Sequence, residues 1–277
     1  MPELPEIRTI AAGLDDALAG HTLSGLEVAR PQCLNGTPGE MRDWILARRV
    51  VRVKPRGKWI LFSLDDIAGD LVAINLGMGA EIRLPGAAEE PPDHYRVRLH
   101  TREGSGVFIR FWWLGHVHYV PGDDETHPVR LLGPDALDEG LDVDAFRGLL
   151  EGRRGGIKAF LLDQRRIAGI GNFYAHDILA RAGVHPLRKI PTLGDDEIAG
   201  LHRSIREVLG ESLDLGGADY ERDIFGRPGR FSRESFIVGY REGTPCGLCG
   251  TTVVRIRTGS TPGDICPGCQ PLPEDRT

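Results

Sequence analysis

The chain has 277 residues and a net charge of −6, with 40% hydrophobic and 27% charged residues, which is ordinary for a soluble globular protein. This length suits one large domain or two modest ones. No stretch approaches the roughly 18 apolar residues that a membrane helix needs, and the acidic start Met1–Glu6 lacks the basic residues and apolar run of a signal peptide. The sequence therefore predicts a cytosolic protein without a membrane partner.

The net charge hides an asymmetry along the chain. Residues 1–150 contain 16 basic and 23 acidic side chains, whereas residues 151–277 contain 18 and 17. Basic residues are concentrated between Arg153 and Arg188, where Asp163 and Asp177 are the acidic ones. Any phosphate-binding surface is therefore expected to be local and built around this segment.

The first part of the chain has the pattern of one helix followed by a β-rich domain. Residues 6–19 place apolar side chains along one helical face. Short apolar runs broken by Gly, Pro and Asp then predict strands. The runs cover residues 23–28, 50–53, 59–64, 71–76, 82–84, 95–100, 107–112 and 116–120. Their spacing favours a β-sandwich or barrel over alternating α/β units.

The second part of the chain has mainly helical patterns. Helices are predicted at residues 145–150, 156–162, 172–182 and 195–213. The Gly- and Arg-rich residues 216–233 predict a mobile loop. The predicted organisation is an N-terminal domain at 1–122, a linker at 123–142, a helical domain at 143–235, a zinc finger at 236–270 and a tail at 271–277.

Four of the five cysteines form two C-x2-C pairs separated by sixteen residues, Cys246 with Cys249 and Cys266 with Cys269. This spacing is typical of a structural zinc site, in which four thiolates surround one ion and leave no open position for catalysis. Thioredoxin-like redox pairs are the alternative. Cys33 is isolated and is interpreted as an ordinary small apolar residue.

Residues 161–175 contain two glycines, Gly169 and Gly171, set around Ile170 directly before a predicted helix. Such a turn exposes backbone amides at a helix N-terminus, which suits a phosphate group. Asn172 can donate a further hydrogen bond. The alternative is a plain helix–turn–helix packing element.

Five motifs occur in one order along nearly the whole chain. They are Pro2–Glu6, Arg56–Lys58, Leu76–Met78, residues 161–175, and the zinc finger that ends in Cys269-Gln270. Together they resemble the formamidopyrimidine-DNA glycosylase/endonuclease VIII family. The resemblance implies a multi-domain α+β fold, with an N-terminal β-sandwich flanked by helices, a helix–two-turns–helix domain and a C-terminal zinc finger. It also implies a monomer that acts on damaged duplex DNA.

The resemblance implies a covalent mechanism at the N-terminus. Pro2, freed by removal of Met1, attacks the sugar C1′ and forms a Schiff base. Glu3 serves as acid and base, Lys58 holds a phosphate near the lesion and assists base loss, and Glu6 supports the lesion pocket. A stiff, charged N-terminus and a solvated lysine at a strand end are the alternatives without catalysis.

The resemblance also implies DNA contacts, because a base must leave the stack before its sugar is reachable. Met78 matches the first of three side chains that fill the vacated space, and Lys158 and Asn172 match phosphate contacts. A core methionine is the alternative for Met78.

Two stretches depart from the family pattern. Most members carry Asp-Pro-Arg-Arg-Phe-Gly, where this chain has residues 110–115, so Trp112 replaces an arginine that reads the opposite base and Leu114 replaces an aromatic wedge. Trp112 can stack on a base but cannot donate a bidentate fork to one. The alternative is that Trp112 and Trp113 straddle the sheet, one in the core and one on the surface.

The zinc finger and two shorter motifs depart as well. Thr261 stands where an arginine usually grips the phosphate beside the lesion, and Arg255 or Arg257 is a candidate substitute. Asn75 replaces a histidine before Leu-Gly-Met, and Ala175-His176-Asp177 stands in place of Ala-Asp-Glu.

Three functions compete on this sequence. The first is a bifunctional glycosylase with abasic-site lyase activity on oxidised or otherwise modified bases. The second is a non-catalytic or weakly active paralogue that senses damaged DNA, and the third is a zinc-ribbon interaction module on an unrelated helical protein. The intact Pro2, Glu3 and Lys58 favour the first.

Overall fold

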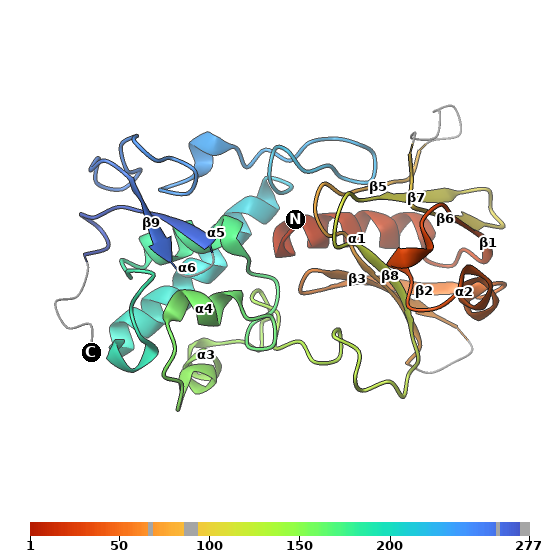
Figure 1. The fold of residues 1–277 in the computed structure, drawn as a ribbon, viewed down its shortest axis with the longest axis horizontal. Helices are drawn as coiled ribbons and strands as arrows, with labels where there is room; N and C mark the ends of the chain where they lie inside the picture. The colour runs from red at the N-terminus through yellow and green to blue at the C-terminus, as the bar shows by residue number, and fades with distance from the viewer. Residues whose placement is uncertain (66–68, 86–93, 259–260, 272–277) are drawn as a thin grey trace. The chain divides into compact units, whose positions relative to one another are not determined.

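The computed structural model describes residues 1–65, 69–85, 94–258 and 261–271. The chain divides into two compact units, one made of Met1–Leu131 with Leu215–Arg230 and the other of Leu132–Asp214 with Phe231–Thr277 (Figure 1). Leu215–Arg230 therefore groups with the N-terminal unit, whereas the sequence analysis places it in the domain at 143–235. No helix among the described residues is both long and apolar enough to cross a bilayer.

Helix α1 (Leu4–Leu18) opens the first unit. It begins two residues earlier than predicted because Glu3 and Glu6 form a capping box, in which the Glu3 amide donates to Glu6 Oε2 at 2.8 Å. Ile7, Leu14 and Leu18 are at most 1% exposed and lie at helical spacing. They join the core cluster that the strands also form.

Two four-stranded antiparallel sheets form the body of this unit, in the orders β1-β6-β7-β5 and β2-β3-β4-β8. Inward-facing side chains of both sheets share one core. The arrangement confirms the predicted β-sandwich and its eight strands. The strands are β1 (Leu23–Val28), β2 (Val50–Arg56), β3 (Trp59–Leu64), β4 (Leu71–Asn75), β5 (Glu81–Arg83), β6 (Val97–Thr101), β7 (Gly106–Arg110) and β8 (His116–Val120).

One helix of the first unit, α2 (Pro38–Ile45), has no counterpart in the sequence prediction. Thr37 caps it by accepting the Glu40 amide at 3.2 Å, while the Thr37 amide donates to Glu40 Oε2 at 2.8 Å. Met41 and Ile45 attach it to the core. A short 3-10 turn, η1 (Pro31–Cys33), precedes it and buries Cys33 as predicted.

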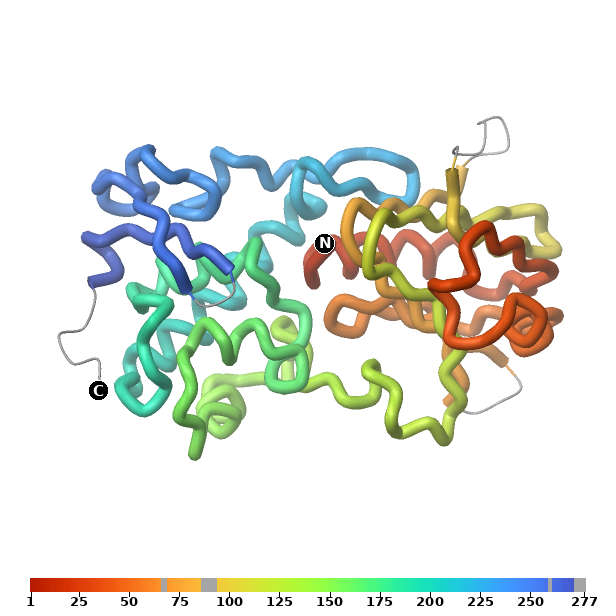
Figure 2. Tube along the Cα trace, in the orientation of Figure 1, coloured from red at the N-terminus to blue at the C-terminus, as the bar shows by residue number. Residues whose placement is uncertain are grey.

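Leu215–Arg230 contains no helix or strand, yet it is packed rather than loose. Ala218 and Ile224 are at most 1% exposed, and the Leu84 amide donates to the Ile224 carbonyl at 2.9 Å. Figure 2 traces the segment in light blue beside the strands of the first unit. The structure therefore has the predicted loop at these residues, and hydrogen bonds and buried side chains attach part of it to the first unit.

The second unit is helical, with α5 at its centre. The helices are α3 (Val143–Leu150), α4 (Ile157–Leu162), α5 (Asn172–Arg181) and α6 (Asp195–Asp214), with a 3-10 turn η2 (Ile190–Thr192) before α6. All four helices agree with the sequence prediction within three residues. Gln164 holds the turn before α5, since its amide donates to the Ile170 carbonyl at 2.7 Å and accepts the Gly169 amide at 2.8 Å.

The C-terminal hairpin, β9 (Val254–Thr258) with β10 (Thr261–Ile265), also belongs to the second unit. A 3-10 turn, η3 (Arg233–Ser235), leads into this region. Asp177 on α5 anchors it by accepting the backbone amides of Ile237, Val238 and Gly239 at 2.7, 3.0 and 2.9 Å. A charged or polar side chain is needed at this buried position because three amides would otherwise lack acceptors.

Candidate functional site

The N-terminus of the first unit is a buried acidic turn. Pro2 is buried, and Glu3 and Glu6 are 4% and 3% exposed. Glu6 accepts the Glu3 amide through Oε2 at 2.8 Å and the Ala218 amide through Oε1 at 2.9 Å. Gly217 has a φ of +92°, and a Cβ there would lie 2.9 Å from Glu6 Cγ, so glycine is required for this approach. Glu6 therefore holds Glu3 and Ala218 in place around the N-terminus.

Lys58 reaches the same turn from the connection between β2 and β3. Its Nζ lies 3.9 Å from Glu3 Oε1, and the two side chains are 14% and 5% exposed. Asn75 at the end of β4 donates to the Lys58 carbonyl at 3.1 Å and accepts the Gly77 amide at 3.0 Å. The asparagine that departs from the family motif thus ties the Lys58 turn to the Met78 turn.

Glu221 is a member of this group that sequence reasoning misses. Its Oε1 lies 3.9 Å from the Met1 ammonium. Burial is the main cause that raises the pKa of Glu221 to about 7; the N-terminal ammonium opposes this shift, and the charge of Glu6 adds to it. The available signal is the pair Gly216-Gly217, which marks a special backbone conformation but not the acid four residues later.

An exposed apolar tip lies elsewhere in the first unit. Met78, Trp112, Trp113 and Leu114 are 47%, 64%, 69% and 67% exposed. The Met78 amide donates to the Trp113 carbonyl at 2.9 Å and the Trp112 amide to the Met78 carbonyl at 3.0 Å, so the four side chains come from two joined turns. The alternatives of a core Met78 and of tryptophans that straddle the sheet are therefore wrong.

Lys158 in the second unit lies beneath the hairpin. It is 4% exposed, and its Nζ donates to Thr258 Oγ1 at 2.7 Å, to the Pro262 carbonyl at 2.9 Å and to Thr261 Oγ1 at 3.4 Å. Burial lowers the pKa of Lys158 to about 8, although the charge of Asp264 opposes the shift. Thr261 is thus a partner of this lysine.

Asn172 begins α5 and contacts His176, one turn later. His176 Nδ1 accepts the Asp264 amide at 2.9 Å, and the Asn172 side-chain amide lies 3.1 Å from Nε2. Burial, followed by the charge of Lys158, lowers the pKa of His176 to about 4, so the imidazole is neutral. The Asn172 atom next to Nε2 is Nδ2, and Asn172 Oδ1 is buried and has no hydrogen-bond partner among the described residues.

The two arginines of the hairpin differ in their surroundings. Arg255 Nε lies 2.7 Å from Asp264 Oδ1, and its Nη1 lies 3.2 Å from Glu242 Oε2. Arg257 is exposed and has no ion pair within the described part of the chain. Of the two candidates for the missing arginine, Arg257 is the one with an uncommitted guanidinium.

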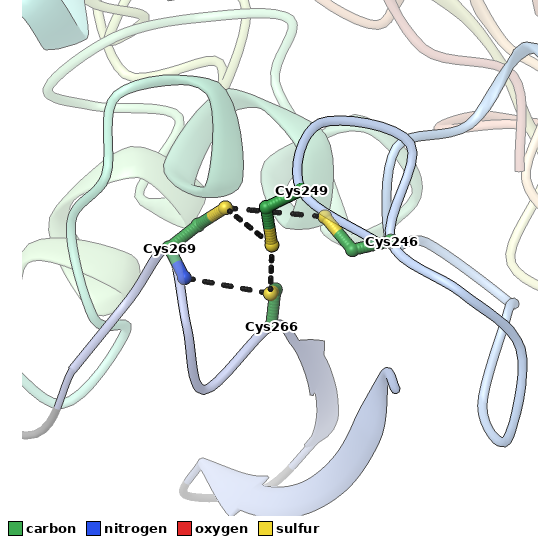
Figure 3. A group of neighbouring side chains, drawn as sticks. All are labelled: Cys246, Cys249, Cys266 and Cys269. Carbon is green, nitrogen blue, oxygen red and sulfur yellow. Dashed lines mark hydrogen bonds between the residues drawn. The ribbon is translucent and has the colours of Figure 1, made fainter. Parts of the chain in front are cut away.

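The four C-terminal cysteines come together at one end of the hairpin (Figure 3). Their Sγ atoms all lie within 4.8 Å of one another, with Cys249 at 3.4 Å from both Cys266 and Cys269 and Cys246 at 4.0 Å from Cys269. Four sulfurs around one ion at the usual Zn–S distance of about 2.3 Å are separated by about 3.8 Å. The cluster therefore has the composition and dimensions of a tetrahedral metal site.

Comparisons with known proteins agree with this geometry. Residues 1–112 match the family model "Formamidopyrimidine-DNA glycosylase N-terminal domain", and residues 132–222 match "Formamidopyrimidine-DNA glycosylase H2TH domain". The chain is 38% identical to the formamidopyrimidine-DNA glycosylase of Cereibacter sphaeroides and 37% identical to that of Chloroflexus aggregans. The alignments cover 98% of this chain in both cases, and 100% and 99% of those proteins.

Solved structures give the same result. The MutM (Fpg) protein from Thermus thermophilus superposes with a TM-score of 0.83 at 35% identity, over 97% of this chain and 98% of that one. Lactococcus lactis Fpg in complex with DNA containing N7-benzyl-Fapy-dG superposes with a TM-score of 0.87 at 25% identity, over 98% of this chain and 100% of that one. The chain belongs to the formamidopyrimidine-DNA glycosylase family.

Proposed function

We propose that this protein is a bifunctional DNA glycosylase and abasic-site lyase that excises oxidised or otherwise modified bases from duplex DNA through Pro2. The observation that carries the proposal is the buried turn at Pro2 and Glu3, with Lys58 Nζ 3.9 Å from Glu3 Oε1. It occurs in a chain that matches proteins named formamidopyrimidine-DNA glycosylase over 98% of its length.

The chemistry requires that Met1 be removed, because only a terminal Pro2 has a secondary amine. The Pro2 nitrogen attacks C1′ and gives up its N–H proton, and the bond from C1′ to the base breaks, so that the base leaves with the electron pair and takes up that proton. Glu3 protonates the sugar ring oxygen, the C1′–O bond opens, and the nitrogen lone pair completes the iminium. Lys58 offers its charge to a phosphate near the lesion and steadies the Glu3 carboxylate.

Strand cleavage follows from the iminium. The cation acidifies the C2′ proton, a carboxylate removes it, and the C3′–O bond breaks with phosphate as the leaving group. The reaction ends after this β-elimination or continues with a δ-elimination that releases the 5′ phosphate, and in either case water then frees Pro2. Glu6 acts as a positioning residue, since both of its oxygens hold backbone amides around the chain end.

The remaining contacts to DNA come from both units. Met78, Trp112 and Leu114 enter the space that the flipped nucleotide leaves. Asn172 donates to a phosphate at the start of α5, and Arg257 supplies the exposed cation of the hairpin. The burial of Lys158 supports a role in which it fixes the hairpin from below, and the ion pairs of Arg255 support a similar role within the hairpin.

We also propose that Cys246, Cys249, Cys266 and Cys269 hold one Zn2+ ion. With four thiolates the coordination is complete, so the metal supplies folding energy to the hairpin rather than a catalytic position. The zinc then keeps Thr258, Thr261 and Arg257 in place relative to α5.

The second candidate is a damage sensor that binds DNA without cutting it. The replacement of the opposite-base reader by Trp112 is the observation that favours it, whereas the complete catalytic turn favours the enzyme. A sensor binds duplex DNA with an abasic site but forms no covalent intermediate.

Borohydride trapping tests the proposal. The Met1-processed protein is incubated with duplex DNA that carries one abasic site, with and without borohydride, beside a Pro2→Gly variant and a form that retains Met1. We expect a covalent adduct and strand cleavage from the processed wild type alone. Specific binding without an adduct would favour the sensor instead.

A further inference from the structure

The apolar tip of the first unit is too exposed and too concentrated to be a packing feature. Trp112, Trp113 and Leu114 are consecutive and each exposes about two thirds of its surface, and Met78 adds a fourth apolar side chain at 47%. Apolar residues gathered in this way mark a surface that meets a partner.

The two turns of the tip approach each other closely at two glycines. A Cβ at Gly77 would lie 2.2 Å from the Trp113 carbonyl oxygen, and one at Gly79 would lie 2.2 Å from Trp112 Cδ1. Both glycines have positive φ, at 59° and 60°. The indole of Trp112 therefore lies against Gly79, and a side chain at position 79 would displace it.

Leu114 is exposed although its backbone conformation is unfavourable. Its φ of 56° lies in the left-handed region, which costs a branched side chain about 1 kcal/mol or more. A Cβ at Gly115 would lie 2.2 Å from Phe111 Cγ, so the chain turns back immediately after the leucine. The strained turn thus exposes the apolar Leu114 side chain to water, although a polar side chain would be better solvated at this position.

The tip is poor in groups that read base edges. An indole has one donor and no acceptor, and methionine and leucine have neither a donor nor a strong acceptor. Arg110, on the adjoining strand β7, is committed to Glu81, with Nη2 2.9 Å from Oε2. A bidentate contact, worth about 1–3 kcal/mol of discrimination, cannot be made from this surface.

We propose that this tip fills the duplex opposite the lesion by stacking alone, with Trp112 as the platform, so that the enzyme accepts any of the four bases opposite the damaged nucleotide. The inference rests on the proposed function, since it assigns the specificity of that same site. Stacking on an aromatic ring is worth about 1–3 kcal/mol per base and tolerates every base, because each has a π-face.

Equilibrium binding tests this inference separately from catalysis. The full-length, Met1-processed protein is titrated into duplexes that carry a non-cleavable abasic analogue opposite C, T, G or A, at one fixed salt concentration. We expect dissociation constants within about threefold of one another. Trp112→Ala should weaken binding to all four duplexes by about tenfold, whereas Val51→Ala, which shortens an exposed side chain on β2, serves as the control.

A Trp112→Arg variant gives the complementary result. The guanidinium restores a two-donor fork, so we expect a preference of about tenfold for one opposite base, with folding checked by circular dichroism and thermal melting. A wild-type preference of tenfold or more for one opposite base would overturn the inference. A Trp112→Ala variant that binds DNA like the wild type would also overturn it, and would assign the tip to another partner. Failure to prefer any abasic duplex over undamaged DNA would overturn the proposed function as well.

Discussion

Glu6 joins the two segments that surround the chain end, and its contacts allow a sharp prediction at the scale of a single residue. In Glu6→Gln, one carboxylate oxygen becomes an NH2 group that faces a backbone N–H, of either Glu3 or Ala218. A buried donor left without an acceptor costs about 1–3 kcal/mol. We expect a loss of that size in the free energy of unfolding, measured by urea denaturation at pH 7.

Glu40→Gln is the matched control for this change. Glu40 occupies the same capping-box position in α2 and accepts the Thr37 amide at 2.8 Å, but it is exposed to water. Water can replace the lost acceptor there, so the effect should be clearly smaller. Equal losses in the two variants would show that Glu6 does no more than cap a helix.

The outer face of strand β8 carries a cluster of imidazoles that makes the first unit sensitive to acid. His118 Nδ1 lies 2.9 Å from His127 Nε2, and the Trp59 ring lies beside both. Burial, followed by the charges of His116 and His127, lowers the pKa of His118 to about 4. Burial also lowers the pKa values of His116 and His127.

This cluster predicts how stability depends on pH. The unfolded chain binds a proton at His118 near pH 6.5 and the folded protein only near pH 4, so stability is lost as pH falls between these values. Between pH 7 and pH 5, the free energy of unfolding should fall by about 1 kcal/mol less in His118→Gln than in the wild type. This figure allows for the partial exposure of His118. Urea midpoints at the two pH values measure it, with exposed His94→Gln as control, and parallel curves for His118→Gln and wild type would contradict it.

The cysteine cluster makes a prediction for the C-terminal hairpin. Cys266→Ser should lower bound zinc from one ion per chain and weaken DNA binding by about tenfold or more, because the hairpin loses its closed tetrahedral site. Elemental analysis and a binding titration measure the two effects. Cys33→Ser, which alters the one cysteine outside the cluster, should retain the ion. Full zinc content in Cys266→Ser would contradict the assignment.

At the same scale, the elements differ in how far the sequence predicts them. The eight strands and the five helices α1 and α3 to α6 are predictable because their apolar residues follow periods of two and 3.6. Helix α2 is harder to predict, since Met41 and Ile45 are its only buried residues and the sequence signals are confined to its start, at Thr37, Pro38 and Glu40. The loop Leu215–Arg230 looks mobile in sequence because the acceptors and apolar neighbours that fix it lie far away in the chain.

The sequence identifies most residues of the candidate site, but it does not predict the contacts that surround them. The spacing of the four cysteines singles out the thiolates, and the family resemblance singles out Pro2 and Glu3. The sequence does not reveal that Lys158 is enclosed by the acceptors of the hairpin or that Arg255 is paired with Asp264, because these contacts join residues 9 to 104 positions apart. Glu221 is missed for the same reason.

At the scale of the whole molecule, a chain of net charge −6 must bind a polyanion through local cations. Affinity for DNA should therefore fall steeply with salt as counterions are released. Arg257→Gln should reduce the slope of log K against log salt by about one. Arg255→Gln should reduce it less, because Asp264 already neutralises that guanidinium at 2.7 Å. Equal slopes for Arg257→Gln and wild type, from titrations at several salt concentrations, would remove Arg257 from the interface.

Peptide mapping of the borohydride-trapped adduct tests the central claim most directly. The trapped complex is digested with nuclease and protease, and mass spectrometry locates the residue that carries the reduced sugar. We expect the modification on the nitrogen of Pro2, in the peptide that begins at that residue. A modification on Lys58 or on another lysine would contradict it, since the catalytic amine would then lie outside the buried turn that Glu3 and Glu6 organise.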